Sequence, residues 1–385
     1  MVPQSDRLLT PRACSGPERC VALTCMLMVI FGAGASYGSV MVAAPLQRAS
    51  SANYELSMRN RPPLTKDLLL PRFGTYAERY NGSGPALVQL QRALDLRPGS
   101  GIETVIGELY AQASGDTEIA RHVLALRFYL ADLIETTADL WWAQHHGITH
   151  YAQLLARLGV WRAATREPVA LVTFNYDTLL DRSLAQQLAG DWHSPRQLTA
   201  NSEGADSSWY VDRDDWRLFK LHGSTSWSRV LDGPDAGIGS DPNATIARAA
   251  RINLTDGPIR DAHWRSDILE AVPAIALPTD AKQRFECPPY HVEAFATNVA
   301  QVDRLLIIGW QAAEPHALEV LADVTPGYRL AVVDVDQKCV DTIMQNLGRV
   351  AAKSPAPMAF TDSFTGLIQG EALEQWLGLE APGGW

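Results

Sequence analysis

The chain has 385 residues, of which 46% are hydrophobic and 20% are charged. This composition is typical of a globular protein with a large core, and it excludes a mainly disordered chain. The formal net charge of −10 argues against a general nucleic-acid or anionic-membrane binder, because such proteins carry clusters of Lys and Arg. We therefore expect a small-molecule ligand, with no direct nucleic-acid partner and no membrane.

The cysteines are few and widely spaced. The five of them are Cys14, Cys20, Cys25, Cys287 and Cys339. No pair has the two-residue spacing of structural zinc sites, and an odd number fits no complete set of disulfides. We interpret them as reduced thiols, which predicts a cytoplasmic protein without a bound metal.

The N-terminal region permits two interpretations. Residues 19–36 combine a basic residue, an apolar run and small residues, which resembles a secretory signal with its cleavage site. Alternatively, residues 27–31 form the first buried strand, and residues 1–25 are a disordered leader or follow a start codon assigned too early. We favour the second interpretation, which predicts one folded domain over residues 26–385. No apolar run reaches the roughly 18 residues of a membrane span.

Four short apolar runs have the character of strands in a parallel sheet. They cover residues 27–31, 169–174, 304–308 and 328–335, and a helix is expected near residues 337–347 after the last run. Apolar strands that alternate with helical patterns predict βαβ units. We therefore expect an α/β fold with a Rossmann-like, doubly wound, mainly parallel sheet.

A long helical stretch separates the first two predicted strands. Apolar residues recur three and four positions apart in the runs 87–94 and 119–134, which indicates amphipathic helices. We expect a helical insertion over about residues 75–158, serving as a lid or a packing module. Within it, Trp141 and Trp142 are expected in the core rather than around a ligand.

The stretch over about residues 231–261 differs from the rest in composition. It is rich in Gly, Pro, Asn and Asp and shows little periodicity. We predict a long, flexible surface loop there, of the kind that often acts as a lid.

A run of small residues follows the first predicted strand. It consists of Gly32, Ala33, Gly34, Ala35 and Ser36. Such residues let the backbone approach a pyrophosphate and offer free amides to bind it. The third glycine of the dehydrogenase fingerprint comes one place late, at Gly38, and Glu55, the acid at about the right distance, falls in a predicted loop. An ordinary dehydrogenase is therefore disfavoured.

Two short polar residues follow the second predicted strand. Asn175 and Asp177 come at its carboxyl end, where open α/β sheets bind their ligands. An Asn can hold a water or a ribose hydroxyl, and an Asp can orient a loop. The structural alternative is that Asp177 only caps the helix that starts near Thr178.

A histidine followed by a glycine closes a further apolar run, residues 216–221. Imidazole suits proton transfer near neutral pH, and a neighbouring glycine allows close approach of a substrate. A lone histidine is more often structural, but the two segments described above favour catalysis by His222.

The order of these motifs resembles the sirtuin-like (silent information regulator two-like) family. A Gly-Ala-Gly-Ala-Ser loop, a Thr-x-Asn-x-Asp strand end and a His-Gly turn follow one another. Residues 62–65, 308–310 and 333–334 also resemble the bacterial branch of that family, so the resemblance spans roughly residues 27–364. It implies a Rossmann-type site for NAD.

The resemblance also implies roles for individual residues. Asn175 and His222 match the catalytic pair of the family, and Asp177 matches the acid that supports the nicotinamide pocket. The residues that match its phosphate loop are Gly32, Ala33, Gly34 and Ser36, with Ala35 between them.

Three further residues follow the later strands. By the same matching, Gly309 would touch the phosphate or the adenosine ribose, and Asp334 would hydrogen-bond the adenine ribose. Trp310 stands where sirtuins have a small hydroxyl residue.

One departure from the family bears on the reaction. Deacylating sirtuins carry a zinc module with two close cysteine pairs, which this sequence lacks. Similar zinc-free bacterial members with a helical insertion are generally associated with NAD hydrolysis in antiphage defence. The resemblance therefore implies an NAD glycohydrolase that uses NAD as its substrate and needs no metal. A protein activator or a homo-oligomer would regulate it.

Two alternatives stay open. A protein deacylase or ADP-ribosyltransferase would cleave the same bond but pass the ribose to an acceptor. A non-catalytic sensor of NAD or ADP-ribose would bind its ligand tightly without forming product.

Overall fold

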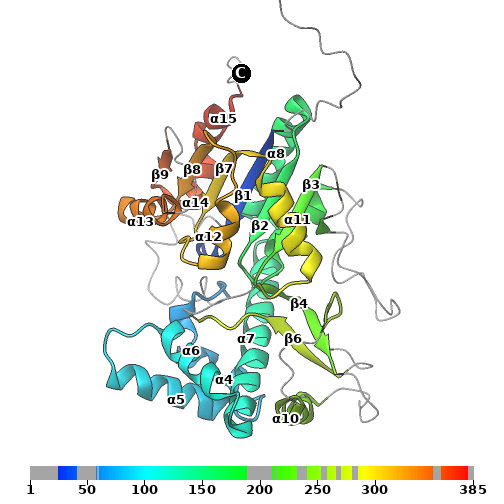
Figure 1. The fold of residues 1–385 in the computed structure, drawn as a ribbon, viewed down its shortest axis with the longest axis vertical. Coiled ribbons are helices and arrows are strands. Elements are labelled where there is room, and N and C mark those ends of the chain that lie inside the picture. The colour runs from blue at the N-terminus through cyan, green and yellow to red at the C-terminus, as the bar shows by residue number, and fades with distance from the viewer. Residues whose placement is uncertain are drawn as a thin grey trace, which may run out of the picture.

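The computed structural model describes residues 25–40, 58, 60–188, 210–211, 213, 215–231, 241–252, 258–265, 270–279, 285–349 and 357–379. These residues form two hydrophobic cores, one around a parallel sheet and one in a helical module, which occupy the upper and lower halves of Figure 1. The predicted leader lies outside the described residues except for Cys25, as does Glu55.

The parallel sheet has six strands in the order β3-β2-β1-β7-β8-β9, and every pairing is parallel. The strands are β1 (Met26–Phe31), β2 (Val169–Thr173), β3 (Trp216–Lys220), β7 (Val302–Ile308), β8 (Arg329–Val333) and β9 (Met358–Phe360). The strand order reverses between β1 and β7, which is the defining feature of a doubly wound sheet. The predicted fold class is confirmed.

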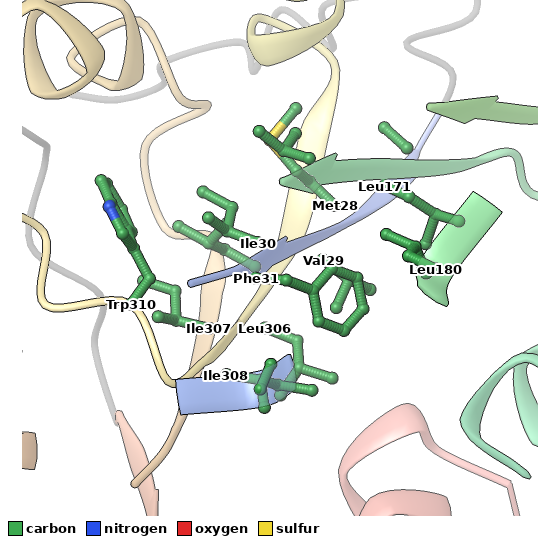
Figure 2. Packing of buried hydrophobic residues seen from close by; sticks show 14 of the residues in the cluster. Met28, Val29, Ile30, Phe31, Leu171, Leu180, Leu306, Ile307, Ile308 and Trp310 are labelled. Carbon is green, nitrogen blue, oxygen red and sulfur yellow. The ribbon is translucent and has the colours of Figure 1, made fainter. Parts of the chain in front are cut away.

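The central strand β1 explains why the sheet is stable. All six of its residues are buried, as expected for a strand with both faces covered by helices. Figure 2 shows its side chains packed with those of β7 and with Leu171 of β2. The register places Phe31 opposite Thr173 on one side and Ile308 on the other, so these three strands end level.

Helices cover both faces of this sheet. Helices α8 and α9 contact each other, as do α8 and α14, whereas α11 and α12 form a separate contact and lie in front of the sheet in Figure 1. The helices around this sheet are α1 (Ala33–Tyr37), α8 (His150–Thr165), α9 (Leu179–Gln187), α11 (Pro289–Val299), α12 (Pro315–Leu321), α13 (Gln337–Leu347), α14 (Ser363–Gln369) and α15 (Ala372–Leu377).

The second core joins helices to a small antiparallel sheet of order β5-β4-β6. Its elements are η1 (Thr65–Asp67), η2 (Pro71–Phe73), α4 (Gly74–Ala77), α5 (Ser83–Leu96), α6 (Ile102–Gln112), α7 (Thr117–Gln144), α10 (Pro242–Ile252), β4 (Gly223–Val230), β5 (Ile259–Arg260) and β6 (Ala271–Ile275). The long helix α7 belongs to both cores, because Leu130 packs in the module and Trp141 packs against the parallel sheet. Trp141 is buried and Trp142 is packed against the core, as expected.

Two segments differ from the sequence-based expectations. The stretch 231–261, predicted as a flexible loop, contains α10, which buries Ile246, Ala249 and Ala250 against the module. These residues have the spacing of a helix face, but their alanines carry little hydrophobic signal among the surrounding Gly, Pro and Asp. The predicted insertion, 75–158, includes most of α8, yet α8 packs in the sheet core and not in the module.

Candidate active site

The carboxyl ends of five strands meet at one edge of the parallel sheet. Their last residues pair in register and are Phe31, Thr173, Lys220, Ile308 and Val333. The segments that follow these residues therefore start side by side. They carry nearly all the residues singled out above: 32–36, 174–177, 221–224, 309–310 and Asp334.

The turn after β1 packs against the turn after β7, where the strand order reverses. The Gly32 amide donates to the carbonyl of Ile308 at 3.0 Å, and the Gly34 amide donates to that of Gly309 at 3.2 Å. A Cβ on Gly32 would lie 2.4 Å from the Gly309 oxygen, and one on Gly309 would lie 2.5 Å from the backbone nitrogen of Ala35. Glycine is thus required for this backbone contact, and Gly309 also has a φ of +61°.

This packing corrects one expectation. We expected free amides in the turn after β1, but those of Gly32 and Gly34 are bonded to the turn after β7. The Ala35 amide is also bonded, to the carbonyl of Gly32 at 2.9 Å. Glycines at these positions therefore serve first to bring two turns together.

Asn175 faces the turn after β1. Its side-chain amide donates to the carbonyl of Gly32 at 2.8 Å and to the hydroxyl of Ser36 at 2.9 Å. The same nitrogen lies 3.3 Å from the hydroxyl of Tyr151, which comes from α8. Asn175 is buried, so the end of β2 is fastened to the end of β1.

Asp177 follows Asn175 by two residues in the sequence and is also buried. Burial raises the pKa of its carboxyl group, whereas the nearby Lys220 ammonium and a hydrogen bond from Ser36 oppose this increase. Its Oδ1 accepts the amide of Leu179, the first residue of α9, at 3.0 Å. Asp177 therefore binds an amide at the start of α9, as the capping interpretation proposed, and it also lies among buried polar groups.

A fully buried lysine completes this group. The Lys220 ammonium donates to the backbone carbonyl of Asp177 at 2.7 Å and to the carboxylate of Asp181 at 2.8 Å. The side chains of Lys220 and Asp181 both have 0% of their surface exposed. We call this group the strand-end cluster: Ser36, Tyr151, Asn175, Asp177, Asp181 and Lys220.

His222 lies in an aromatic group next to the strand-end cluster. Its ring centroid is 4.7 Å from that of Phe174 and 6.0 Å from that of His316, and it is buried. Phe174 directly precedes Asn175 in the sequence, so the aromatic group and the strand-end cluster are adjacent along the chain. Asn175 and His222 nevertheless contact different sets of side chains.

Trp310 spans the edge of the sheet. It follows β7, and its indole ring stacks on Phe174, which follows β2, at a centroid distance of 4.7 Å and an interplanar angle of 16°. Since β1 lies between these strands, the ring passes over the end of β1. The indole N–H donates to the carboxylate of Glu314 at 2.7 Å, and Trp310 is only 3% exposed. Trp310 therefore covers the place where the strand order reverses.

Asp334 lies at the end of β8, with β7 between it and β1. Its carboxylate accepts the amide of Val335 at 2.7 Å, and its own amide donates to the carbonyl of Phe360 at 3.1 Å. Asp334 is half-buried. It therefore shares the edge with the strand-end cluster but has separate contacts.

Sequence reasoning missed three members of the strand-end cluster. Tyr151 gave no signal, because it reaches Ser36 from 115 residues away in the sequence. Lys220 did give a signal in the sequence, because a charged residue at the end of an apolar parallel strand needs a buried partner. That partner, Asp181, lies on the α9 face that packs on the sheet.

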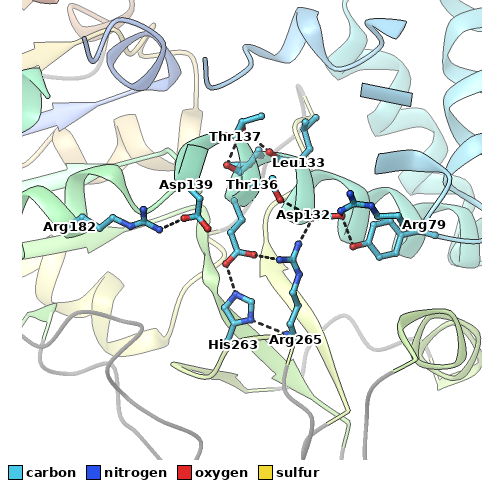
Figure 3. A network of polar contacts seen from close by, with 12 residues as sticks. Arg79, Asp132, Leu133, Thr136, Thr137, Asp139, Arg182, His263 and Arg265 are labelled. Carbon is cyan, nitrogen blue, oxygen red and sulfur yellow. Dashed lines mark hydrogen bonds and ion pairs between the residues drawn. The ribbon is translucent and has the colours of Figure 1, made fainter. Parts of the chain in front are cut away.

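A second group of acids lies on α7 (Figure 3), of which Asp132 and Glu135 are buried and Asp139 is half-buried. We call Asp132, Glu135 and Asp139 the α7 polar row. Arg265 contacts both Asp132 and Glu135, and Arg79 donates to Asp132 at 2.8 Å. The other partners are His263 for Glu135 and Arg182 for Asp139. Each acid of the row thus has a basic partner, and the row fastens α7 to its neighbours.

The described residues offer neither a metal-ion site nor a membrane-spanning helix. Across the described ranges, no group of three or more His, Cys, Asp or Glu side chains is arranged to hold a metal ion. Within the same ranges, no helix is both long and apolar enough to cross a membrane.

No protein-family model and no curated protein matches this sequence. Its fold is similar to solved structures of Sir2 homologues. A mutant Sir2 homologue in complex with 2'-O-acetyl ADP ribose has 14% identity, with 93% of this chain and 95% of that chain covered and a TM-score of 0.42. A Sir2 homolog–NAD complex has 11% identity, coverages of 92% and 88%, and a TM-score of 0.41. These values describe a distant similarity of the overall fold.

Proposed function

We propose that this protein hydrolyses NAD at the bond between nicotinamide and ribose, giving nicotinamide and ADP-ribose. The main support for this proposal is that the parallel strands end at the same level. Their ends bring the glycine turns, Asn175 and His222 to one edge of the sheet. Open α/β sheets bind dinucleotides at such an edge, where the strand order reverses. The order of the sequence motifs supports the same function, with residues 26–385 as a single NAD-binding domain.

In this proposal, the pyrophosphate of NAD lies against residues 32–36, with Gly309 beside it and Asp334 towards the adenine ribose. The nicotinamide end lies over β2, beside Asp177. This placement requires the Trp310 ring to move off Phe174, because the ring covers the end of β1. Rotation about the Trp310 side chain breaks one stacking contact and its hydrogen bond to Glu314.

The reaction needs one water and no metal. As the bond from nicotinamide to ribose lengthens, its electron pair leaves with nicotinamide, which becomes neutral, and positive charge develops on the ribose. Asn175 positions the water or a ribose hydroxyl, and His222 accepts the proton of the water as its oxygen bonds to the ribose. General-base catalysis of this kind typically contributes about 10²–10⁴ in rate.

The test is nicotinamide release from NAD by the full-length protein, compared with Asn175→Ala and His222→Ala. We expect each variant to lose at least about 10²-fold in rate while retaining binding of ADP-ribose. His263→Ala is the control, because His263 belongs to the partners of the α7 polar row and should leave the rate unchanged. Full turnover by either site variant would contradict the assignment.

The same assay separates the alternatives. Release that depends on an added acylated peptide would instead indicate transfer to an acceptor, and tight NAD binding without release would indicate a sensor. We further propose that the activity serves antiphage defence in the cytoplasm, under a protein activator or through self-assembly. Cells that express the wild type, but not His222→Ala, should then lose NAD during phage infection.

A further inference from the structure

A buried lysine connects the two segments that carry Asn175 and His222. Strands β2 and β3 pair in register up to Thr173 and Lys220, so Asn175 and His222 each come two residues after this last pair. The Lys220 ammonium reaches from the end of β3 to the segment after β2, where it donates to the backbone carbonyl of Asp177 at 2.7 Å. One side chain therefore joins the segment of Asn175 to the strand that leads into His222.

The position of this ammonium is fixed by a second set of bonds. It also donates to the Asp181 carboxylate on α9 at 2.8 Å, and the other oxygen of that carboxylate accepts the Tyr210 hydroxyl at 3.0 Å. Lys220, Asp181 and Tyr210 are all 0% exposed. Charged hydrogen bonds are stronger than neutral ones, and here water does not compete for them. The donor to the Asp177 carbonyl is thus held in one place.

The stability of the core does not by itself account for a lysine at this position. Burying an ammonium and a carboxylate costs free energy, and well-packed apolar residues in place of such a pair often leave a protein as stable or more stable. An apolar residue at position 220 would fill the same part of the core. It would not supply the hydrogen bond that holds the Asp177 carbonyl, two residues after Asn175.

The contacts of Lys220 lie on the side of the site where the reacting groups are. The Thr225 amide donates to the Tyr176 carbonyl at 2.8 Å, so a backbone bond reinforces the connection that Lys220 makes between the same two segments. In the sheet, β2 separates β3 from β1, and β7 lies beyond β1. The turns after β1 and β7, against which the pyrophosphate is placed, are therefore held by other bonds.

We propose that Lys220 is a positioning residue of the active site, which holds the segment of Asn175 at a fixed distance from His222. This inference rests on the proposed function, because that function gives Asn175 and His222 their parts in the reaction. Loss of Lys220 should therefore slow the cleavage step and leave the binding of ADP-ribose intact.

The test is the double variant Lys220→Met/Asp181→Asn in the full chain. Removing Lys220 alone leaves Asp181 charged and buried without its cation, whereas the double variant removes both charges and keeps an oxygen for the Tyr210 hydroxyl. We expect kcat for nicotinamide release to fall about 10–10²-fold, because a displacement of about 1 Å between reacting groups has effects of this size. The Kd of ADP-ribose should stay within about twofold.

Arg248→Met/Glu270→Gln is the matched control. It neutralises an ion pair between α10 and the residue before β6, within the helical module, by the same two kinds of substitution. It should leave kcat unchanged. The inference would be overturned by an unchanged kcat in the Lys220 double variant, by an equal fall in the control, or by a loss of ADP-ribose affinity as large as the fall in kcat.

Amide hydrogen exchange of the ligand-free protein, resolved by residue, needs no activity and separates this inference from the proposed function. In Lys220→Met/Asp181→Asn, the Thr225 amide should exchange about tenfold faster, because the segments that its bond joins open more often. The Gly32 amide, bonded to the Ile308 carbonyl, should exchange as in the wild type. Unchanged exchange at Thr225 refutes the role of Lys220, whereas a wild type that releases no nicotinamide refutes only the proposed function.

Discussion

Two groups of acids, both with buried members, are neutralised in different ways. In the α7 polar row, the two arginines that bind Asp132 are well exposed: the side chains of Arg79 and Arg265 are 54% and 41% exposed. In the strand-end cluster, Asp177 and Asp181 share one lysine, Lys220, whose side chain is wholly buried. A group with several half-exposed partners tolerates the loss of one, whereas a buried group with a single cation does not.

The largest effect that separates the two groups is expected from removing their cations. Lys220→Met leaves Asp181 buried without its ion pair, so we expect the free energy of unfolding to fall by about 3–5 kcal/mol. Arg265→Met leaves Asp132 with Arg79, so we expect a loss of about 1 kcal/mol. Urea unfolding of both variants measures the difference, and equal losses would contradict the distinction.

A smaller effect is expected from opening the site beside the strand-end cluster. Trp310→Ala removes the ring that a ligand must displace, together with its stacking contact and its hydrogen bond. These two interactions are worth about 1–2 kcal/mol, so ADP-ribose should bind about tenfold more tightly.

Glu314→Gln weakens only the hydrogen bond of the indole and should give a smaller gain in affinity. Calorimetric titration with ADP-ribose measures all three proteins. Weaker binding by Trp310→Ala would show that the ring contacts the ligand instead of covering its site.

The smallest effect concerns how stability depends on pH. The folded-state pKa of Asp177 is raised, mainly by burial, so the native protein holds this proton more tightly than the unfolded chain does. Its contribution to stability is therefore full below the ordinary carboxyl pKa and is lost as the pH rises through the raised value. Asp177→Asn removes this dependence and should be slightly more stable than the wild type at pH 7.

Asp132→Asn provides the opposite case within the α7 polar row. Asp132 accepts from Arg79, Arg265 and Tyr80, so neutralising it weakens charged hydrogen bonds and should destabilise the protein at pH 7. Urea unfolding between pH 5 and pH 8 compares the two variants. If both variants changed the free energy of unfolding at pH 7 in the same direction, the difference between the strand-end cluster and the α7 polar row would be contradicted.

The backbone plan was largely predictable because it depends on local patterns. Apolar runs located β1, β2, β7 and β8 to within two residues, and the helix predicted over residues 337–347 is α13. The strand ends then followed from the rule that parallel strands place their carboxyl ends together. The antiparallel sheet was missed, because β4 and β6 give no alternating pattern when they are buried along their whole length.

The detail of the site was less predictable, because it depends on contacts that no local pattern encodes. Ser36 was expected to bind a phosphate, yet its hydroxyl is hydrogen-bonded to that of Tyr151, which lies 115 residues later in the sequence. Trp310 was recognised only as an unusual residue at its position. Its stacking on Phe174 depends on the strand order, which brings the ends of β7 and β2 to either side of β1.

The position of β1 at the centre of the sheet has a consequence for how the protein is made. This apolar strand, Met26–Phe31, pairs on one side with β7, which begins at Val302. At roughly 5–20 residues per second, the ribosome needs about 14–54 s to reach β7 after it has made β1. During that time one edge of β1 stays unpaired, and unpaired apolar strands readily join other chains. Aggregation during synthesis should therefore depend more on the speed of translation between β1 and β7 than on the stability of the finished fold.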